Sequence, residues 1–173
     1  WEQVLKKWIF NIPQCNFVSK IELFKYYYMI NNKLAEFVNL DNDNVLCHHD
    51  IHSANVIISD GKLSLIDLEF SYTDYNFIEL GNIICELNTD YENQIYSYQN
   101  SRTIEKEIIL QQYYGSVNDT NKLKLEIGIL ISHLYWCIWG IYMNKINGSE
   151  IFDYLKFSKS RINSLKDSLI YLL

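Results

Sequence analysis

The sequence contains little glycine, and its glycines stand far apart. Only six glycines occur among 173 residues, and none belongs to a G-x-G-x-x-G segment. No V-A-I-K-like strand precedes residue 50 either. A glycine-rich loop and a strand lysine cover and hold the nucleotide phosphates in many phosphoryl-transfer enzymes. We therefore expect no phosphate-covering lobe of this kind within the chain.

Positive charge is also scarce. The chain contains 15 Lys and Arg residues and 21 Asp and Glu residues, so its net charge is −6. Such a surface does not attract nucleic-acid backbones or anionic lipids, and we expect neither as a partner. It weakly favours a cationic small molecule. Hydrophobic residues make up 49% and aromatic residues 15% of the chain, which together with its length predicts a single globular domain over residues 1–173.

Cysteine pairs and a leader pattern are missing as well. The four cysteines contain no C-x-x-C pair, and three of them lie in apolar runs. We expect buried free thiols in a reducing compartment, hence a cytoplasmic protein. The chain opens on an amphipathic stretch at Trp1, which is not the pattern of a signal peptide. The cysteines are Cys15, Cys47, Cys85 and Cys137.

One long apolar run extends from Ile127 to Met143, interrupted by Ser132 and His133. It is slightly short for a membrane span, and it carries two tryptophans in its middle, where a lipid-facing helix favours leucine. We predict a buried core helix and no membrane span.

Hydrophobic periodicity predicts a mostly helical α+β fold. Helical spacing covers the first forty residues, through Ile21, Phe24, Tyr28, Leu34, Ala35 and Val38, and a turn follows at 41–44. Short strands are predicted at 45–47, 56–58 and 63–66, and the Ser59–Lys62 turn joins the last two into a β-hairpin. Irregular chain is expected from 67 to 79. The remaining helices are predicted at about 79–89, 102–114, 121–145 and 151–171.

Polar residues gather at both ends of this hairpin. The segment C-H-H-D-I-H-S-A-N at 47–55 precedes it, and L-I-D-L-E at 65–69 follows it. An aspartate, an asparagine five positions later and two carboxylates after a strand are the layout of a phosphoryl-transfer site. Asp50 is predicted to accept the proton of an attacking hydroxyl, and Asn55 and Asp67 to ligate Mg²⁺. Glu69 shares a face with Asp67, and so could support the metal, if the strand geometry continues.

Each of these residues taken singly is more often a loop cap, and only the joint spacing favours catalysis. The nearby histidines raise a second alternative, a zinc site formed by His48, His49 and His52 with Cys47. The rest of a zinc shell is not supplied at the usual spacing. We therefore interpret His48 as a brace that holds the loop through hydrogen bonds.

Aromatic residues repeat at helical spacing in the second half of the chain. Two tryptophans three positions apart share a helix face, and a tyrosine–phenylalanine pair repeats the spacing on the next predicted helix. Such faces attract a desolvated cation, although an aromatic stripe is more often simply core. The candidate residues for a cation pocket are Glu86, Tyr91, Trp136, Trp139, Tyr154 and Phe157.

These motifs, in this order, resemble the choline/ethanolamine kinase family. The resemblance runs from Leu46 to Phe157 and includes Gly81-Asn82, Cys85-Glu86 and the late S-H-x-x-W-x-x-W segment at 132–139. It implies the C-terminal lobe of a protein-kinase-like fold and ATP- and Mg²⁺-dependent phosphorylation of a small amino alcohol. It also implies that Asp50 is the base and that the aromatic candidates enclose the ammonium head.

Three positions depart from the pattern of the family. His49 stands where the family usually has asparagine, and Phe157 falls where tyrosine is common. Glu79 replaces an aspartate, which leaves its role in bracing the catalytic loop open.

The resemblance leaves several functions open. Choline kinase, which serves phosphatidylcholine synthesis, is the leading hypothesis, and ethanolamine kinase is a close alternative. The paired tryptophans disfavour an antibiotic phosphotransferase. A non-catalytic choline-binding fragment or pseudokinase is the remaining alternative, because the ATP-binding N-terminal lobe is expected to be absent from this chain. We expect the isolated chain to be inactive, and a homodimer is possible.

Overall fold

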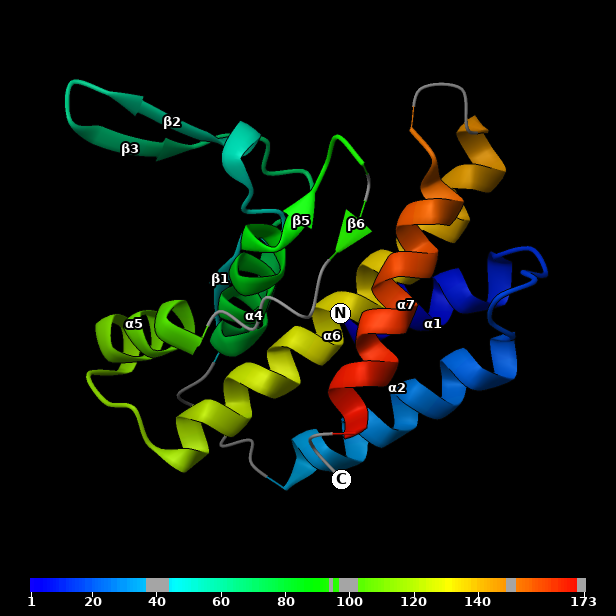
Figure 1. Cartoon of the computed structure of the whole chain (residues 1–173), viewed down its shortest axis with the longest axis horizontal. Helices are drawn as coiled ribbons and strands as arrows, with labels where there is room; N and C mark the ends of the chain where they lie inside the picture. Colours follow the sequence, from blue (N-terminus) through cyan, green and yellow to red (C-terminus); the bar gives the residue numbers. More distant parts are fainter. Residues whose placement is uncertain (37–43, 94, 97–102, 149–151, 171–173) are drawn as a thin grey trace.

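The computed structural model describes residues 1–36, 44–93, 95–96, 103–148 and 152–170. The fold is mostly helical with small antiparallel sheets, as the sequence predicts (Figure 1). The helices are α1 (Glu2–Asn11), α2 (Lys20–Ala35), α4 (Asn76–Leu87), α5 (Thr103–Tyr114), α6 (Asp119–Asn147) and α7 (Tyr154–Ile170). The strands are β1 (Asn44–Cys47), β2 (Val56–Ser59), β3 (Lys62–Leu65), β4 (Tyr72–Tyr75), β5 (Thr89–Asp90) and β6 (Ile95–Tyr96), and a 3₁₀ turn, η1, covers Ser53–Asn55.

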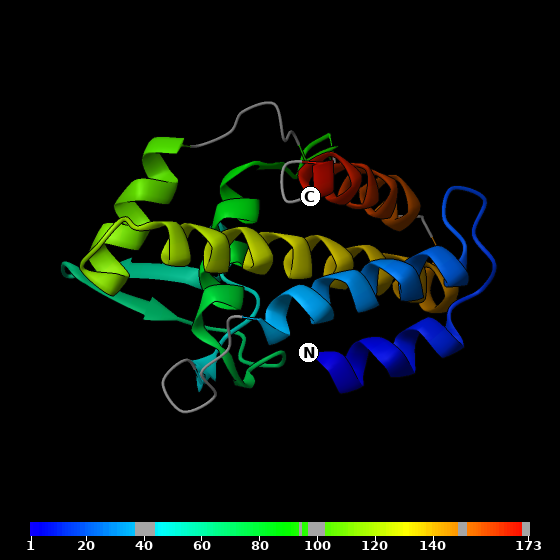
Figure 2. The ribbon, with the colours of Figure 1, turned by 90° about the horizontal axis from the view of Figure 1, so that it is seen from below.

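Helix α6 forms the axis of the fold. Helices α1 and α2 lie on one side of it and α7 on the other (Figure 2). Its residues 127–138 are buried around the whole circumference, which explains the long and mostly apolar run. By length and composition α6 could also cross a membrane, but 83% of its apolar window is buried inside the fold. The structure thus confirms the predicted core helix.

Helices α4 and α6 cross at two glycines. A Cβ atom on Gly81 would lie 2.2 Å from the carbonyl carbon of Gly128, and one on Gly128 would lie 1.9 Å from the carbonyl oxygen of Phe77. No side chain fits there, so the two backbones approach as closely as only glycine allows. This crossing fixes α4, which carries several site residues, against the core helix.

The N-terminal helical run is divided, which the periodicity did not show. Helices α1 and α2 are separated by residues 12–19, and a capping box between Ser19 and Glu22 starts α2. The predicted spacing holds only in part, since Ile21 is 82% and Tyr28 56% exposed, whereas Leu34 is buried and Phe24 packs against the core. Val38 and residues 41–43 of the predicted turn lie outside the described residues. The face of α2 that is buried consists of Leu23, Tyr27, Ile30 and Leu34.

The predicted hairpin is present, but the strand content after it was underestimated. Strands β2 and β3 pair from Val56 with Leu65 to Ser59 with Lys62, and the hairpin extends away from the helices (Figure 1). The segment expected to be irregular contains β4, which pairs antiparallel with β1. Helix α4 then begins at Asn76, three residues before the predicted start. The pairing of β1 with β4 anchors the loop that follows β1.

The cysteine prediction holds for three of four positions. Cys47, Cys85 and Cys137 are buried free thiols, whereas Cys15 is only half-buried. Burial raises the pKa of the Cys47 thiol to about 12, so this group stays protonated beside the catalytic loop.

Candidate active site

The loop between β1 and η1 is held by one carboxylate of α4. The backbone N–H groups of His48 and His49 donate to the two oxygens of Glu79, each at 2.8 Å. His49 has a positive φ of 65°, a conformation that needs such support. The glutamate at this position therefore braces the loop, which answers the question that the sequence left open.

His48 ties the same loop to the segment that carries Asp67. The backbone N–H of Asp50 donates to Nδ1 of His48 at 3.3 Å, and Nε2 of His48 lies 2.8 Å from the carbonyl oxygen of Ile66. Because Nδ1 accepts, Nε2 carries the proton and donates. Both ring nitrogens are thus engaged within the loop, in the bracing arrangement expected from the sequence, and neither is available to zinc. No group of three His, Cys, Asp or Glu residues able to hold a metal ion occurs among the described residues.

Asp50 and Asn55 face each other across the loop. The amide nitrogen of Asn55 donates to the carbonyl oxygen of Asp50 at 3.0 Å and to its carboxylate at 3.1 Å. The backbone N–H of Ile66 donates to the carbonyl oxygen of Asn55 at 3.0 Å, which brings the next residue, Asp67, beside Asn55. The hairpin thereby joins two polar segments that are separated in sequence.

The predicted relation between Asp67 and Glu69 is wrong. Strand β3 ends at Leu65, and Asp67 adopts a left-handed conformation with φ of 63°. Strand alternation therefore stops before these residues, and their spacing does not place them on one face. Glu69 instead lines the cleft described next.

The donors in this region fit Mg²⁺. Asn55 keeps its amide oxygen for a ligand because its amide nitrogen is bound to Asp50, and Asp67 is exposed. Mg²⁺ prefers hard oxygen ligands, and it is usually held by one or two carboxylates together with phosphates and water. A protein site of three acidic or imidazole side chains is therefore not needed.

A cleft of about 340 Å³ opens beside Asp50. All six residues predicted to bind the substrate line it, and so do Asp50 and Glu69. A larger hollow of about 450 Å³ lies along α2, but it contains none of the motif residues. The residues that line the cleft are Asp50, His52, Glu69, Phe70, Glu86, Tyr91, Trp136, Trp139, Phe152, Tyr154 and Phe157.

The aromatic walls of the cleft contact one another edge to face. The rings of Trp136 and Trp139 lie 5.1 Å apart at 75°, and those of Trp139 and Tyr154 lie 5.5 Å apart at 68°. Trp136 and Phe157 are also buried, at 6% and 4% exposure. The residues of the aromatic stripe thus belong to the core, as the alternative interpretation predicts, and they also form the wall of the cleft.

Acidic groups give the cleft a negative character. Burial raises the pKa of Asp50, the charge of Glu86 raises it further, and His52, whose Nε2 lies 3.6 Å away, lowers it. Burial also raises the pKa of Tyr91, and the charge of Glu86 adds to this effect. The Tyr91 hydroxyl therefore keeps its proton and donates to Glu86.

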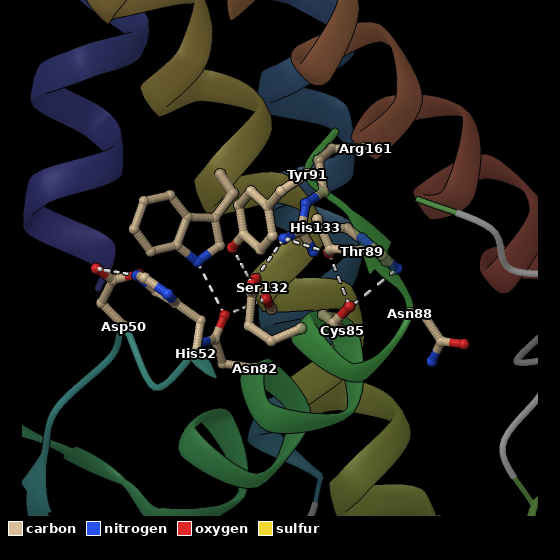
Figure 3. A network of polar contacts seen from close by, with 12 residues as sticks. Asp50, His52, Asn82, Cys85, Asn88, Thr89, Tyr91, Ser132, His133 and Arg161 are labelled. Carbon is tan, nitrogen blue, oxygen red and sulfur yellow. Dashed lines mark hydrogen bonds and ion pairs between the residues drawn. The ribbon is translucent and has the colours of Figure 1, made fainter. Parts of the chain in front are cut away.

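Two residues of the site gave no functional signal on their own. Asn82 of α4 accepts hydrogen bonds from Ser132 Oγ and Trp136 Nε1, both at 2.9 Å, and so orients the tryptophan (Figure 3). Arg161 of α7 reaches Glu86 from behind the cleft. Its signal in the sequence is a charged residue four positions after Phe157, on the buried face of an otherwise amphipathic helix.

The comparison with known proteins agrees with this geometry. The family model described as choline/ethanolamine kinase matches residues 1–166. The chain belongs to the choline/ethanolamine kinase family. The family implies a phosphotransferase that uses ATP and a small-molecule substrate.

The relatives are similar at a modest level. The probable ethanolamine kinase A of Dictyostelium discoideum is 29% identical, over 92% of this chain and 50% of its own length. The choline/ethanolamine kinase of Rattus norvegicus is 26% identical, over 87% of this chain and 44% of its own length. The chain thus spans about half the length of the curated relatives it matches.

Solved structures confirm the protein-kinase-like fold. The ethanolamine kinase of Plasmodium vivax aligns with a TM-score of 0.70 at 20% identity, covering 96% of this chain and 46% of that one. The choline kinase of Streptococcus pneumoniae aligns with a TM-score of 0.65 at 22% identity, covering 98% of this chain and 53% of that one.

Proposed function

We propose that the chain is the substrate-binding and catalytic half of a choline kinase, which transfers the γ-phosphoryl group of ATP to the hydroxyl of choline. The observation that carries the proposal is the position of Asp50 on the wall of the aromatic cleft. A cation held by the aromatic rings would present a hydroxyl on a short arm to this carboxylate.

Asp50 acts as the base in this proposal. It accepts the proton of the choline hydroxyl while the hydroxyl oxygen forms its bond to the γ-phosphorus and the bond to the ADP leaving group breaks. The raised pKa of Asp50 makes its carboxylate a stronger base than an ordinary aspartate. The hydrogen bond from the amide nitrogen of Asn55 holds the carboxylate in place.

Mg²⁺ would be held by Asn55 and Asp67. When bound, the ion neutralises charge on the transferring phosphates. The glycine-rich loop that covers ATP is missing from the sequence. We therefore propose that the chain acts as a C-terminal lobe, that a separate lobe provides this loop, and that the chain alone does not turn over. A homodimer and a cytoplasmic location stay predictions.

Choline is favoured over ethanolamine by the lining of the cleft. Seven of its eleven lining residues are aromatic. A trimethylammonium group needs aromatic surface, whereas a primary ammonium needs several hydrogen-bond acceptors. Relatives named for either substrate are similar to this chain, so the lining of the cleft is the ground for this preference.

Two measurements test the proposal. With the ATP-binding lobe present, Asp50→Asn should lower kcat for phosphocholine formation by about 10²- to 10⁴-fold and leave the affinity for choline nearly unchanged. Undiminished turnover would refute the base assignment. Choline binding to a protein that forms no phosphocholine would favour the pseudokinase alternative.

The second measurement addresses the cleft. Trp139→Leu should weaken choline binding, followed by calorimetry, by about tenfold. Phe10→Leu is the matched control, because Phe10 is 71% exposed and does not line the cleft. Equal affinities in the two variants would argue against the aromatic cation site, and a higher kcat/KM for ethanolamine than for choline would favour the ethanolamine alternative.

A further inference from the structure

A buried arginine stands behind the wall of the cleft. The Arg161 side chain is fully buried, and its Nη2 donates to Oε1 of Glu86 at 2.6 Å. The same nitrogen lies 3.4 Å from Oγ1 of Thr89. The guanidinium also lies over the ring of Phe157, 5.0 Å from its centroid. Arg161 thus contacts two walls of the cleft, Glu86 of α4 and Phe157 of α7, without lining the cleft itself.

Glu86 is held at both of its oxygens. Oε1 accepts from Arg161, and Oε2 accepts from the Tyr91 hydroxyl. The Glu86 side chain is only 6% exposed. A buried carboxylate is costly unless a cationic partner and hydrogen bonds compensate its charge. The arginine supplies that charge and, together with Tyr91, fixes the direction of the carboxylate.

We infer that Arg161 is a positioning residue for the cationic head of the substrate, acting through Glu86. It balances the charge of the carboxylate and aims it along the cleft wall. The inference rests on the proposed function and extends it, because it assigns part of the cation recognition to a residue that does not touch the cation.

A purely structural role makes a different prediction. A buried ion pair often adds nothing to stability compared with uncharged residues of similar volume, whereas loss of one partner is costly. If Arg161 serves only the fold, its removal should weaken the binding of charged and uncharged ligands alike. If it positions Glu86, its removal should weaken the binding of a cation only, and it should have no further effect once Glu86 is replaced.

The test is a double-mutant cycle on the full chain, read by the intrinsic tryptophan fluorescence of the cleft. The probes are choline and 3,3-dimethylbutan-1-ol, its uncharged analogue of similar shape. Arg161→Met and Glu86→Gln should each weaken choline binding by about tenfold. The combined variant should be no weaker than Glu86→Gln alone, and the uncharged analogue should bind all variants equally. Arg161→Lys, which keeps the charge, should retain most of the affinity.

Lys159→Met is the matched control, because it removes the same charge from an exposed position of α7. Equal weakening for both probes, or additive effects in the combined variant, would overturn the inference. If Arg161→Met does not fold, Arg161→Lys and the combined variant still decide the question. Failure of the unmodified chain to bind choline, ethanolamine or tetramethylammonium would instead count against the proposed function.

Discussion

Glu79 supports a direct prediction about the catalytic loop. Glu79→Ala would leave the N–H groups of His48 and His49 without their acceptor. A hydrogen bond to a charged group is worth about 1.5–3 kcal/mol. Two such bonds would suggest up to about 6 kcal/mol, but Glu79 is only half-buried and water can replace part of the loss. We therefore expect a loss of about 3 kcal/mol in the free energy of unfolding.

Glu79→Gln removes the charge of the side chain and keeps its shape, so it shows how much of the effect is due to the charge. The glutamine keeps one oxygen as acceptor, but its NH₂ group faces the second backbone N–H. We expect Glu79→Gln to lower the free energy of unfolding by about 2 kcal/mol, which places this variant between the unmodified chain and Glu79→Ala.

Urea unfolding at pH 7 measures both variants. With a slope of about 2 kcal/mol per molar urea, the alanine variant should lower the midpoint by about 1.5 M. Glu36→Ala is the matched control, because Glu36 forms an exposed pair with Lys33 at 2.9 Å, of a kind usually worth less than about 1 kcal/mol. If Glu79→Ala shifts the midpoint no more than Glu36→Ala, Glu79 does not brace the loop. Choline affinity should fall together with stability, since the braced loop carries Asp50.

Two further predictions concern the core. Burial lowers the pKa of His49 to about 3 and that of His133 well below its usual value. Both stay neutral in the folded protein and gain protons on unfolding below about pH 6.5, so stability should fall by about 2 kcal/mol per histidine between pH 7 and pH 5. A urea midpoint that does not change over this range would contradict the prediction, and His133→Gln should flatten the dependence. Gly128→Ala places a Cβ 1.9 Å from the Phe77 carbonyl oxygen and should cost about 3 kcal/mol or more. Circular dichroism would show this as a lower melting temperature, and an unchanged one would argue against the close helix crossing.

The catalytic motif could be predicted because its chemistry is local. The spacing from Asp50 to Asn55 and the hairpin turn at Asp60-Gly61 depend on neighbouring residues, and the hairpin brings Ile66, the residue before Asp67, into hydrogen-bond contact with Asn55. The aromatic candidates also share one cleft.

The features that were missed depend on partners distant in sequence. Strand β4 has four residues with two tyrosines and an aspartate, and only its pairing with β1 makes it a strand. The buried face of α2 is decided by α1 and α6, which its own spacing does not reveal. The sequence places Arg161 on the buried face of its helix, but it does not reveal the partner of this charge, Glu86, which lies 75 positions away.

Helix α4 carries two glutamates with different tasks, seven residues apart. Glu79 holds the loop that carries Asp50, and Glu86 lines the cleft. Seven residues make nearly two turns, so both side chains leave the same side of the helix, about 10 Å apart along its axis. If the chain binds choline as proposed, α4 would therefore set the distance between the reacting hydroxyl and the ammonium group. We expect it to select for the length of the amino alcohol, so that a homologue of choline with one more methylene would bind yet be phosphorylated slowly.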